Sequence, residues 1–421
     1  MNPTKLLVTA VLVVGASPLA AQDAPGSTPS VFRRFGDYVV KIQVVENGSG
    51  AKATVGSGFF VTGAGHVVTN YHVISKLVQD PDRYHAELID ARGNARAIRA
   101  LGVDVVHDLA VVRSDSPSAR HFTLREVTPE QGARLYSLGH PSDLGLSIVE
   151  GTYNGELQHT LYPKIHFTGS INPGMIGGPT LTDEGAVVGI NVSTAGDELS
   201  FLVPVERAQA LLATVTAPNY RPPTSFLDVV ARQIIAYQNV YLAGMFAAGT
   251  KTVQLGRYHV PTQPAPFFRC WADAERKPEL PYETIKHRCS TDDYLYIAGD
   301  QESGIVTVSH ELLTSRGLNT LRFYALYSHV FARDETPSGE REHVTRWTCR
   351  ASTIDAGSGP LRTVLCVRAY RKLGGLYDAV LKTAPLGQRD AAIVSTLTLA
   401  GVTYDNIGAI SRRFVERISW R

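Results

Sequence analysis

Short apolar runs separated by turn residues dominate the first half of the chain after about residue 36. Val and Ile are frequent in these runs, for example in Tyr38–Val45, Leu109–Val112 and Ala186–Ile190. Runs of this kind at short intervals predict strands of an all-β barrel or sandwich. Residues 206–215 predict one short helix that closes this part of the chain.

The second half of the chain has a different pattern. Residues 216–224 hold three prolines and no periodicity, which predicts a linker. Ser225, with Asp228 three residues later, predicts the capped start of a helix. Strands, turns and a final helix near 406–418 follow, so we expect an α+β domain at 225–421. Apolar residues at spacings of three or four predict the packing face of its first helix: Phe226, Val230, Ile234, Tyr237, Tyr241 and Met245.

Residues 1–21 predict an export signal. Lys5 supplies a positive charge and Leu6–Ala16 is an apolar run. Ser17–Pro18 breaks the run, and small residues then precede Gln22. A membrane-spanning helix would need about 20 apolar residues, so the pattern favours a cleaved signal peptide. We therefore expect a periplasmic or secreted protein without a transmembrane segment.

Composition narrows the function classes further. The chain of 421 residues has 44% hydrophobic and 19% charged residues and a formal net charge of +2. These values are typical of globular domains, and two domains of ordinary size fit the length. The chain has neither a polybasic tract nor an acidic tail, so we expect no nucleic-acid partner. Histidine spacings match no metal-ligand pattern, and we expect no metal and no cofactor.

All four cysteines lie in the second half, which predicts two disulfides in an exported chain. Cys349 and Cys366 fall in two expected strands around the turn 355–360, where their sulfurs would face each other across a hairpin. That assignment pairs Cys270 with Cys289. The alternative, a four-cysteine zinc site, lacks the paired Cys-x-x-Cys spacing.

Three segments of the first half occur in an order that carries chemistry. Gly56–Val61 precedes Val67–Val73, which contains His72. Asp108 comes next, followed by Leu-Ala-Val. The last segment, Ser170–Pro179, is rich in glycine.

Together the three segments resemble the trypsin-like serine protease family, most closely its HtrA/DegP branch. The resemblance covers about 36–215 and implies two six-stranded antiparallel β-barrels with a cleft between them. It implies that His72 is the general base and Asp108 the carboxylate that orients it. It also implies an oxyanion hole made by the backbone N–H groups of Gly174 and Ile176. Ser170 would lie at the base of the specificity pocket.

Residue 176 departs from the family, which has the nucleophilic serine at this position. Isoleucine has no hydroxyl, thiol or amine, so it cannot attack a carbonyl. In subtilisin, loss of the serine alone lowers kcat by about 10⁶. The neighbouring hydroxyls of Thr168, Ser170 and Thr180 would lie off the required geometry.

These observations leave three functions open. The first is a pseudo-protease that binds unfolded or extended polypeptide in its cleft without cutting it. The second is an active serine-type endopeptidase with a nucleophile that the sequence does not reveal. The third is a structural platform for an envelope interaction module in the second half. The PDZ modules of HtrA proteins have no counterpart motif after residue 215.

Overall fold

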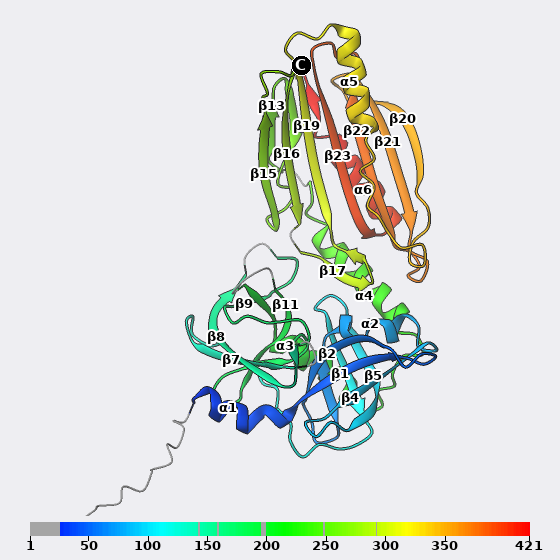
Figure 1. Cartoon of the computed structure of the whole chain (residues 1–421). Helices are drawn as coiled ribbons and strands as arrows, with labels where there is room; N and C mark the ends of the chain where they lie inside the picture. The colour runs from blue at the N-terminus through cyan, green and yellow to red at the C-terminus, as the bar shows by residue number, and fades with distance from the viewer. Residues whose placement is uncertain (1–25, 142–143, 158–159, 195–198, 247–248, 292) are drawn as a thin grey trace, which may run out of the picture.

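Two closed barrels and an open sheet make up the computed structural model (Figure 1). The barrels form the lower half of the view in Figure 1, and the open sheet stands above them. The predicted signal peptide, residues 1–21, lies outside the described part of the chain. The structure describes residues 26–141, 144–157, 160–194, 199–246, 249–291 and 293–421.

The first barrel closes six antiparallel strands in the order β1-β2-β3-β6-β5-β4. Side chains from facing strands, such as Ile42, Phe59 and Leu88, are fully buried inside it. This burial of β-branched and aromatic side chains is what the apolar runs predicted. The strands are β1 (Val39–Glu46), β2 (Lys52–Phe60), β3 (His66–Thr69), β4 (Tyr84–Ile89), β5 (Ala95–Asp104) and β6 (Leu109–Ser114).

The second barrel closes another six antiparallel strands, in the order β10-β11-β12-β9-β8-β7. The expected double antiparallel β-barrel is therefore confirmed. Its own hydrophobic cluster includes Leu135, Phe167 and Leu202, each fully buried. The strands are β7 (Arg134–Gly139), β8 (Ser147–Glu156), β9 (Ile165–Phe167), β10 (Pro179–Leu181), β11 (Val187–Thr194) and β12 (Ser200–Pro204).

Four short helices accompany the barrels. The helix expected at 206–215 is present as α3 (Val205–Thr216), and α2 (Tyr71–Gln79) follows β3 directly. Helix α1 (Thr28–Phe35), which leads into the 3₁₀ helix η1 (Gly36–Tyr38), was not expected from the sequence. No helix among the described residues is both long and apolar enough to cross a membrane.

The second half of the chain begins with α4 (Phe226–Tyr241). Its apolar stripe is buried as expected, with Val230 and Ile234 fully inaccessible. The predicted capping bond of Ser225 is wrong: the residue occupies the N-cap position, but its side chain makes no capping hydrogen bond.

A seven-stranded antiparallel sheet forms most of the second half, in the order β15-β16-β19-β23-β22-β21-β20. Helix α6 (Tyr404–Val415) packs on one face, where Phe414 stacks on His310 of β19. Helix α5 (Thr320–Ala332) packs on the other face, against Leu313. The seven strands are β15 (Phe268–Glu275), β16 (Tyr282–Thr291), β19 (Val306–Ser315), β20 (Thr348–Asp355), β21 (Pro360–Ala369), β22 (Tyr377–Pro385) and β23 (Ala391–Val402).

Two small sheets complete the second half. One has the order β13-β14-β24, and the other is the hairpin β17-β18. Their strands are β13 (Thr252–Leu255), β14 (Tyr258–Pro261), β17 (Leu295–Ala298), β18 (Gln301–Ser303) and β24 (Ser419–Trp420).

The large sheet carries both disulfides, Cys270–Cys289 and Cys349–Cys366. These are the two pairs that the sequence favoured. In each pair the cysteines lie directly opposite each other on neighbouring antiparallel strands. Each disulfide therefore links an edge strand of the sheet, β15 or β20, to the strand beside it.

The hairpin β17-β18 connects the sheet region to the barrels. Figure 1 shows β17 and α4 between the two parts of the molecule. Helix α2 packs against both β17 and α4. The hydroxyl of Tyr71, at the start of α2, donates a 2.8 Å hydrogen bond to the carbonyl of Ile297 in β17. The helix that begins beside His72 is thus held by residues from both halves of the chain.

Candidate active site

His72 and Asp108 form a directly hydrogen-bonded pair. Nδ1 of His72 lies 2.6 Å from Oδ2 of Asp108. The backbone N–H of His72, in the first turn of α2, donates to Oδ1 of the same carboxylate at 2.9 Å. Asp108 therefore caps α2 and also accepts the Nδ1 proton of the ring. With that proton on Nδ1, Nε2 can act as the base.

Asp108 adopts an uncommon backbone conformation, with a φ of +52°. Among side chains other than glycine, Asp and Asn enter this left-handed region most readily. The carbonyl of Asp108 accepts hydrogen bonds from the amide of Asn70 at 2.6 Å and from the backbone of Tyr71 at 3.2 Å. These bonds connect the turn before β6 to the start of α2. They keep the carboxylate of Asp108 next to the imidazole of His72.

The glycine-rich loop that precedes β10 packs against β2. Gly174 and Gly177 have φ values of +93° and +88°, which glycine adopts at no steric cost. A Cβ on Gly177 would lie only 2.2 Å from the carbonyl oxygen of Ser57. The backbone N–H of Ser57 donates to the carbonyl of Ile176 at 2.8 Å. The loop conformation therefore depends on glycine and on the backbone of β2.

Ser57 is a positioning residue that the sequence analysis missed. Its hydroxyl donates to the carbonyl of Gly174 at 2.6 Å and accepts the backbone N–H of His140 at 2.9 Å. Among the hydrogen bonds of the described residues, none has the N–H of Gly174 or Ile176 as its donor. Both N–H groups are thus available for the oxyanion hole that the resemblance implies. The only sequence signal for Ser57 was its place in Gly56–Val61.

Ile176 stands next to the histidine segment. A Cβ added to Gly56 would lie 2.6 Å from the Val73 side chain and 3.2 Å from the carbonyl oxygen of Ile176. Ile176 therefore lies close to Val73, the residue that follows His72. The Ile176 side chain is half-buried and packs against the hydrophobic cluster of the second barrel. This side chain presents only carbon atoms at the position that the resemblance assigns to the nucleophile.

Neighbouring hydroxyls are engaged elsewhere. The hydroxyl of Thr180 donates to Asn191, at 2.7 Å, and is fully buried. Thr168 bonds Thr152 through both hydroxyls at 2.9 Å. Ser170 is exposed, and its place in a specificity pocket remains a prediction. The hydroxyls of Thr168 and Thr180 are therefore held by other residues and offer no replacement for a serine at residue 176.

A cavity of about 490 Å³ adjoins the His72–Asp108 pair, and the second half of the chain supplies one of its walls. Ser193 of β11 also lines this cavity. The ring of Tyr296, in β17, meets the His72 ring edge-to-face with 5.8 Å between their centroids. The sequence analysis did not predict this wall. Residues from the second half that line the cavity are Asp293, Tyr294, Leu295 and Tyr296.

A buried ion pair fixes that wall to the second barrel. Nζ of Lys164 lies 2.6 Å from Oδ1 of Asp293, and each side chain is 9% exposed. Nζ of Lys164 also lies 4.6 Å from the centre of the Tyr162 ring. A buried ion pair becomes unfavourable when one partner is removed, because the remaining charge has left water. The pair therefore couples the position of residues 293–296 to the second barrel.

The electrostatics of the site favour a charged imidazole. Burial lowers the pKa of His72, but the charge of the Asp108 carboxylate and its hydrogen bond raise it by more. The net result is a raised pKa. A carboxylate that stabilises the imidazolium is the function of the orienting acid in serine proteases. No group of three or more His, Cys, Asp or Glu among the described residues is placed to hold a metal ion.

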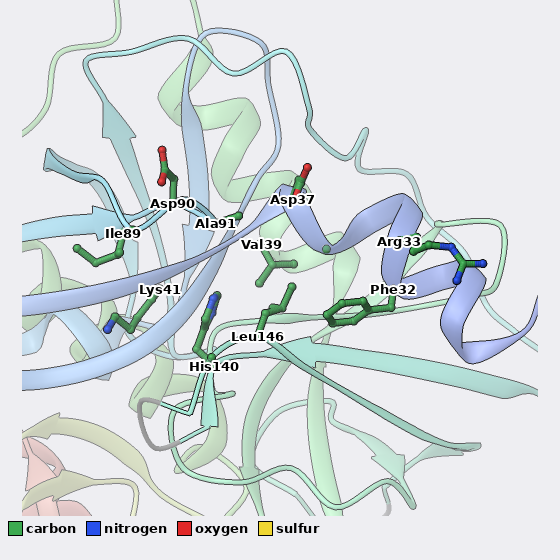
Figure 2. Close-up of a pocket in the computed structure, with 13 residues that line it drawn as sticks. Phe32, Arg33, Asp37, Val39, Lys41, Ile89, Asp90, Ala91, His140 and Leu146 are labelled. Carbon is green, nitrogen blue, oxygen red and sulfur yellow. The ribbon is translucent and has the colours of Figure 1, made fainter.

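A second cavity, of about 460 Å³, begins at His140 (Figure 2). Lys41 of β1 and Phe32 of α1 line it, and Figure 2 shows α1 along one side. The backbone of His140 bonds Ser57, so one residue of this cavity is linked through Ser57 to the glycine-rich loop.

Comparisons with known proteins agree with this geometry. Residues 56–190 match the family model of the trypsin-like peptidase domain. A probable periplasmic DegP-like serine endoprotease of Halomonas elongata is 29% identical over 43% of this chain and 40% of its own length. Protease Do-like 5 of Arabidopsis thaliana, a chloroplastic protein, is 29% identical over 37% of this chain and 56% of its own.

The chain thus spans roughly two-fifths to somewhat over half of the length of these two relatives. A crystal structure of the serine endoprotease from Yersinia pestis matches with a TM-score of 0.39 and 25% identity, over 46% of this chain and 68% of that one. The matched segment contains His72, Asp108 and the glycine-rich loop, inside two closed barrels. The first half of this chain therefore has a trypsin-like serine protease fold of the HtrA/DegP type.

Proposed function

We propose that the barrel pair is an exported pseudo-protease domain, which binds extended polypeptide in its cleft and does not cut it. The observation that carries the proposal is Ile176, a hydrocarbon side chain beside an assembled His72–Asp108 pair. Without a nucleophile the base has no proton to remove, and no acyl-enzyme can form. The proposed oxyanion hole, Gly174 and Ile176, would then only hold a carbonyl oxygen of the bound chain.

Space in the cleft supports polypeptide as the ligand. One cavity adjoins His72, and another includes His140, whose backbone bonds Ser57. An extended peptide presents side chains in alternate directions, so its side chains could enter a cavity beside His72. The two relatives above are named as a probable serine endoprotease and a protease, which supports polypeptide as the class of ligand.

Export is part of the proposal. The signal-like pattern of residues 1–21 and the two disulfides suit an oxidising compartment outside the cytoplasm. Among the relatives, the Halomonas protein is named a periplasmic endoprotease.

Cleavage of reduced casein by the purified chain tests the loss of activity. We expect the natural chain and Ile176→Val to be inert, because neither has a hydroxyl at residue 176. We expect Ile176→Ser to cleave, and His72→Ala in the Ile176→Ser background to abolish the cleavage. If the natural chain cleaves casein and His72→Ala stops it, the proposal is wrong.

Binding is tested separately, with fluorescently labelled reduced casein. A tryptophan at Ser193 would fill the cavity beside His72, so we expect Ser193→Trp to weaken binding at least about tenfold, or about 1.4 kcal/mol. Thr353→Trp, on the exposed strand β20, is the matched control and should leave binding unchanged. Equal affinity in all three proteins would exclude the cleft as the binding site.

An active endopeptidase with another nucleophile is the second candidate. It is favoured by one observation: the hydroxyl-bearing Ser193 lines the same cavity as His72. In this case the natural chain would cleave casein, and Ser193→Ala would stop it without preventing casein binding.

A further inference from the structure

The two disulfides have the same placement but different surroundings. Each joins directly opposed cysteines of an edge strand and its neighbour. In each pair one cysteine is exposed and the other buried: Cys289 is 0% and Cys366 8% exposed. Position and exposure therefore do not distinguish the two bonds. A difference in their chemistry must come from the groups around the sulfur atoms.

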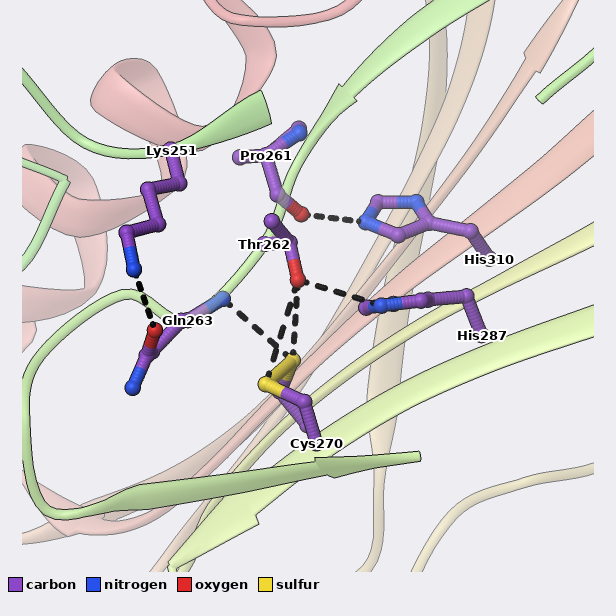
Figure 3. The surroundings of a disulfide bond; sticks show 8 residues. Lys251, Pro261, Thr262, Gln263, Cys270, His287 and His310 are labelled. Atoms are coloured by element: carbon purple, nitrogen blue, oxygen red, sulfur yellow. Dashed lines mark hydrogen bonds between the residues drawn. A yellow bond between two sulfur atoms is a disulfide. The ribbon is translucent and has the colours of Figure 1, made fainter. Parts of the chain in front are cut away.

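Hydrogen-bond donors surround one disulfide only. The backbone N–H of Gln263 donates to Sγ of Cys289 at 3.3 Å, and the hydroxyl of Thr262 lies 3.4 Å from the same sulfur (Figure 3). Thr262 also lies 3.8 Å from Sγ of Cys270. Among the hydrogen bonds of the described residues, none ends on a sulfur of Cys349 or Cys366.

His287 orients the threonine hydroxyl. Its Nε2 lies 3.1 Å from Oγ1 of Thr262. A hydroxyl has one proton, so when Thr262 donates to the sulfur its oxygen is free to accept the Nε2 proton of His287. Burial lowers the pKa of His287, which favours the neutral ring that has one such proton. The result is a chain of hydrogen bonds from His287 through Thr262 to Cys289, and Figure 3 shows the link between His287 and Thr262 beside the disulfide.

Donors at this position stabilise a thiolate. A hydrogen bond to an anionic acceptor is about twice as strong as one between neutral groups. The bonds to Sγ of Cys289 therefore strengthen when the S–S bond breaks and the electron pair stays on this sulfur. A more stable thiolate is a better leaving group in thiol–disulfide exchange. Because Cys270 is exposed, an incoming thiolate can reach its sulfur.

We propose that Cys270–Cys289 is a thiol–disulfide exchange site for a dithiol reductant, small or carried by a protein, and that Cys349–Cys366 is a structural bond. One thiolate of the dithiol attacks Sγ of Cys270 and forms a mixed disulfide, while the Cys270–Cys289 bond breaks and its electron pair leaves on Cys289. The second thiol then attacks the mixed disulfide and releases Cys270. The dithiol becomes a disulfide, and its two electrons and two protons end on Cys270 and Cys289.

Partial reduction of the whole chain with dithiothreitol tests this proposal. Samples are quenched by alkylation, and peptide mass spectrometry gives the reduced fraction of each pair. We expect Cys270–Cys289 to be reduced on the order of tenfold faster than Cys349–Cys366, from the dependence of the rate on leaving-group pKa. With glutathione as a monothiol, the mixed disulfide should form on Cys270.

Variants separate the donors from general accessibility. Thr262→Val removes the hydroxyl but keeps the Gln263 donor, so it should reduce the rate difference, whereas Thr262→Ser should keep the difference unchanged. Thr348→Val, beside Cys349 on β20, is the matched control and should change neither rate. Equal rates in the natural chain, or glutathione attached to Cys289, would overturn the proposal even if Thr262→Val fails to fold.

Discussion

The two halves of the molecule deal differently with the edges of their strands. Each barrel closes six strands on themselves, so neither barrel has an edge strand. The seven-stranded sheet is open, and its edge strands β15 and β20 are exposed along almost their whole length. An exposed edge can pair with other chains or fray. All four cysteines lie here and join each edge strand to its neighbour. The disulfides thus hold the edge strands of the open sheet, where no barrel closure holds them.

Chemistry is also divided between the halves. The barrels supply His72, Asp108 and the glycine-rich loop, whereas the second half supplies Tyr296 and the buried carboxylate of Asp293. The barrels therefore assemble the His72–Asp108 pair, whereas both halves of the chain shape the cavity beside it. Variants that alter one half and leave the other intact therefore test how far the two halves depend on each other.

The largest effect is expected where the two halves meet. Lys164→Met leaves the carboxylate of Asp293 buried without a cation, which should cost about 3–5 kcal/mol. Urea unfolding measures the loss. Hydrogen exchange shows whether β17 loses protection first, as expected if the pair holds the cavity wall.

A double variant and a surface variant control this prediction. Lys164→Met/Asp293→Leu removes both charges and should recover most of the loss, since neither charge is then left unpaired. Lys277→Met breaks the exposed pair with Glu275 and should have no measurable effect. A loss in Lys164→Met that is no greater than in Lys277→Met would contradict the assigned role of the buried pair.

Removing one disulfide should affect the open sheet and not the barrels. Cys349→Ala/Cys366→Ala opens a link across a sequence separation of 17 residues and should cost on the order of 3 kcal/mol. Hydrogen exchange should accelerate in β20 and β21, and protection in β1–β6 should stay unchanged. Equal loss of protection in the barrels would show that the two halves unfold as one unit.

Local motifs explain why the barrels and their site could be predicted from the sequence. His72 and Asp108 each sit in a short segment whose composition serves one chemical task, and the φ values of Gly174 and Gly177 require glycine. Cys349 and Cys366 could be paired because a hairpin places residues symmetrically about its turn. Information of this kind is contained in neighbouring residues.

Long-range contacts explain what could not be predicted. Lys164 and Asp293 are 129 residues apart, and no local pattern brings them together. The placement of Tyr296 over His72 depends on how the hairpin β17-β18 docks against α2, which is a property of tertiary packing. Helix α1 was missed because its eight residues are too few for a clear helical period.

Tyr296 allows a test of the shared cavity wall. The His72 side chain is 28% exposed, and the Tyr296 ring covers part of it. Tyr296→Ala should therefore increase the rate at which diethylpyrocarbonate modifies His72, as followed by mass spectrometry. Tyr296→Phe keeps the ring and should react like the natural chain. If Tyr296→Ala does not change the rate, this ring does not limit access to His72.

The smallest expected effect is a change in the pKa of His72, and it involves only residues of the barrels. Its raised pKa means that folding favours the protonated ring, so this contribution to stability is present at low pH and is lost as pH rises through the folded-state pKa. Asp108→Asn removes the charge that raises the pKa and leaves at most a hydrogen bond to a neutral amide, while burial stays, so the pKa of His72 should fall. NMR titration of the ring measures this.

Asp104→Asn provides the matched control, because Asp104 makes the same kind of pair with His107, at 2.7 Å. It should leave the pKa of His72 unchanged. If Asp108→Asn also leaves it unchanged, the carboxylate does not stabilise the imidazolium. In that case the pair in this chain would have lost its electrostatic function along with the serine, and Ile176→Ser alone would not be expected to restore cleavage.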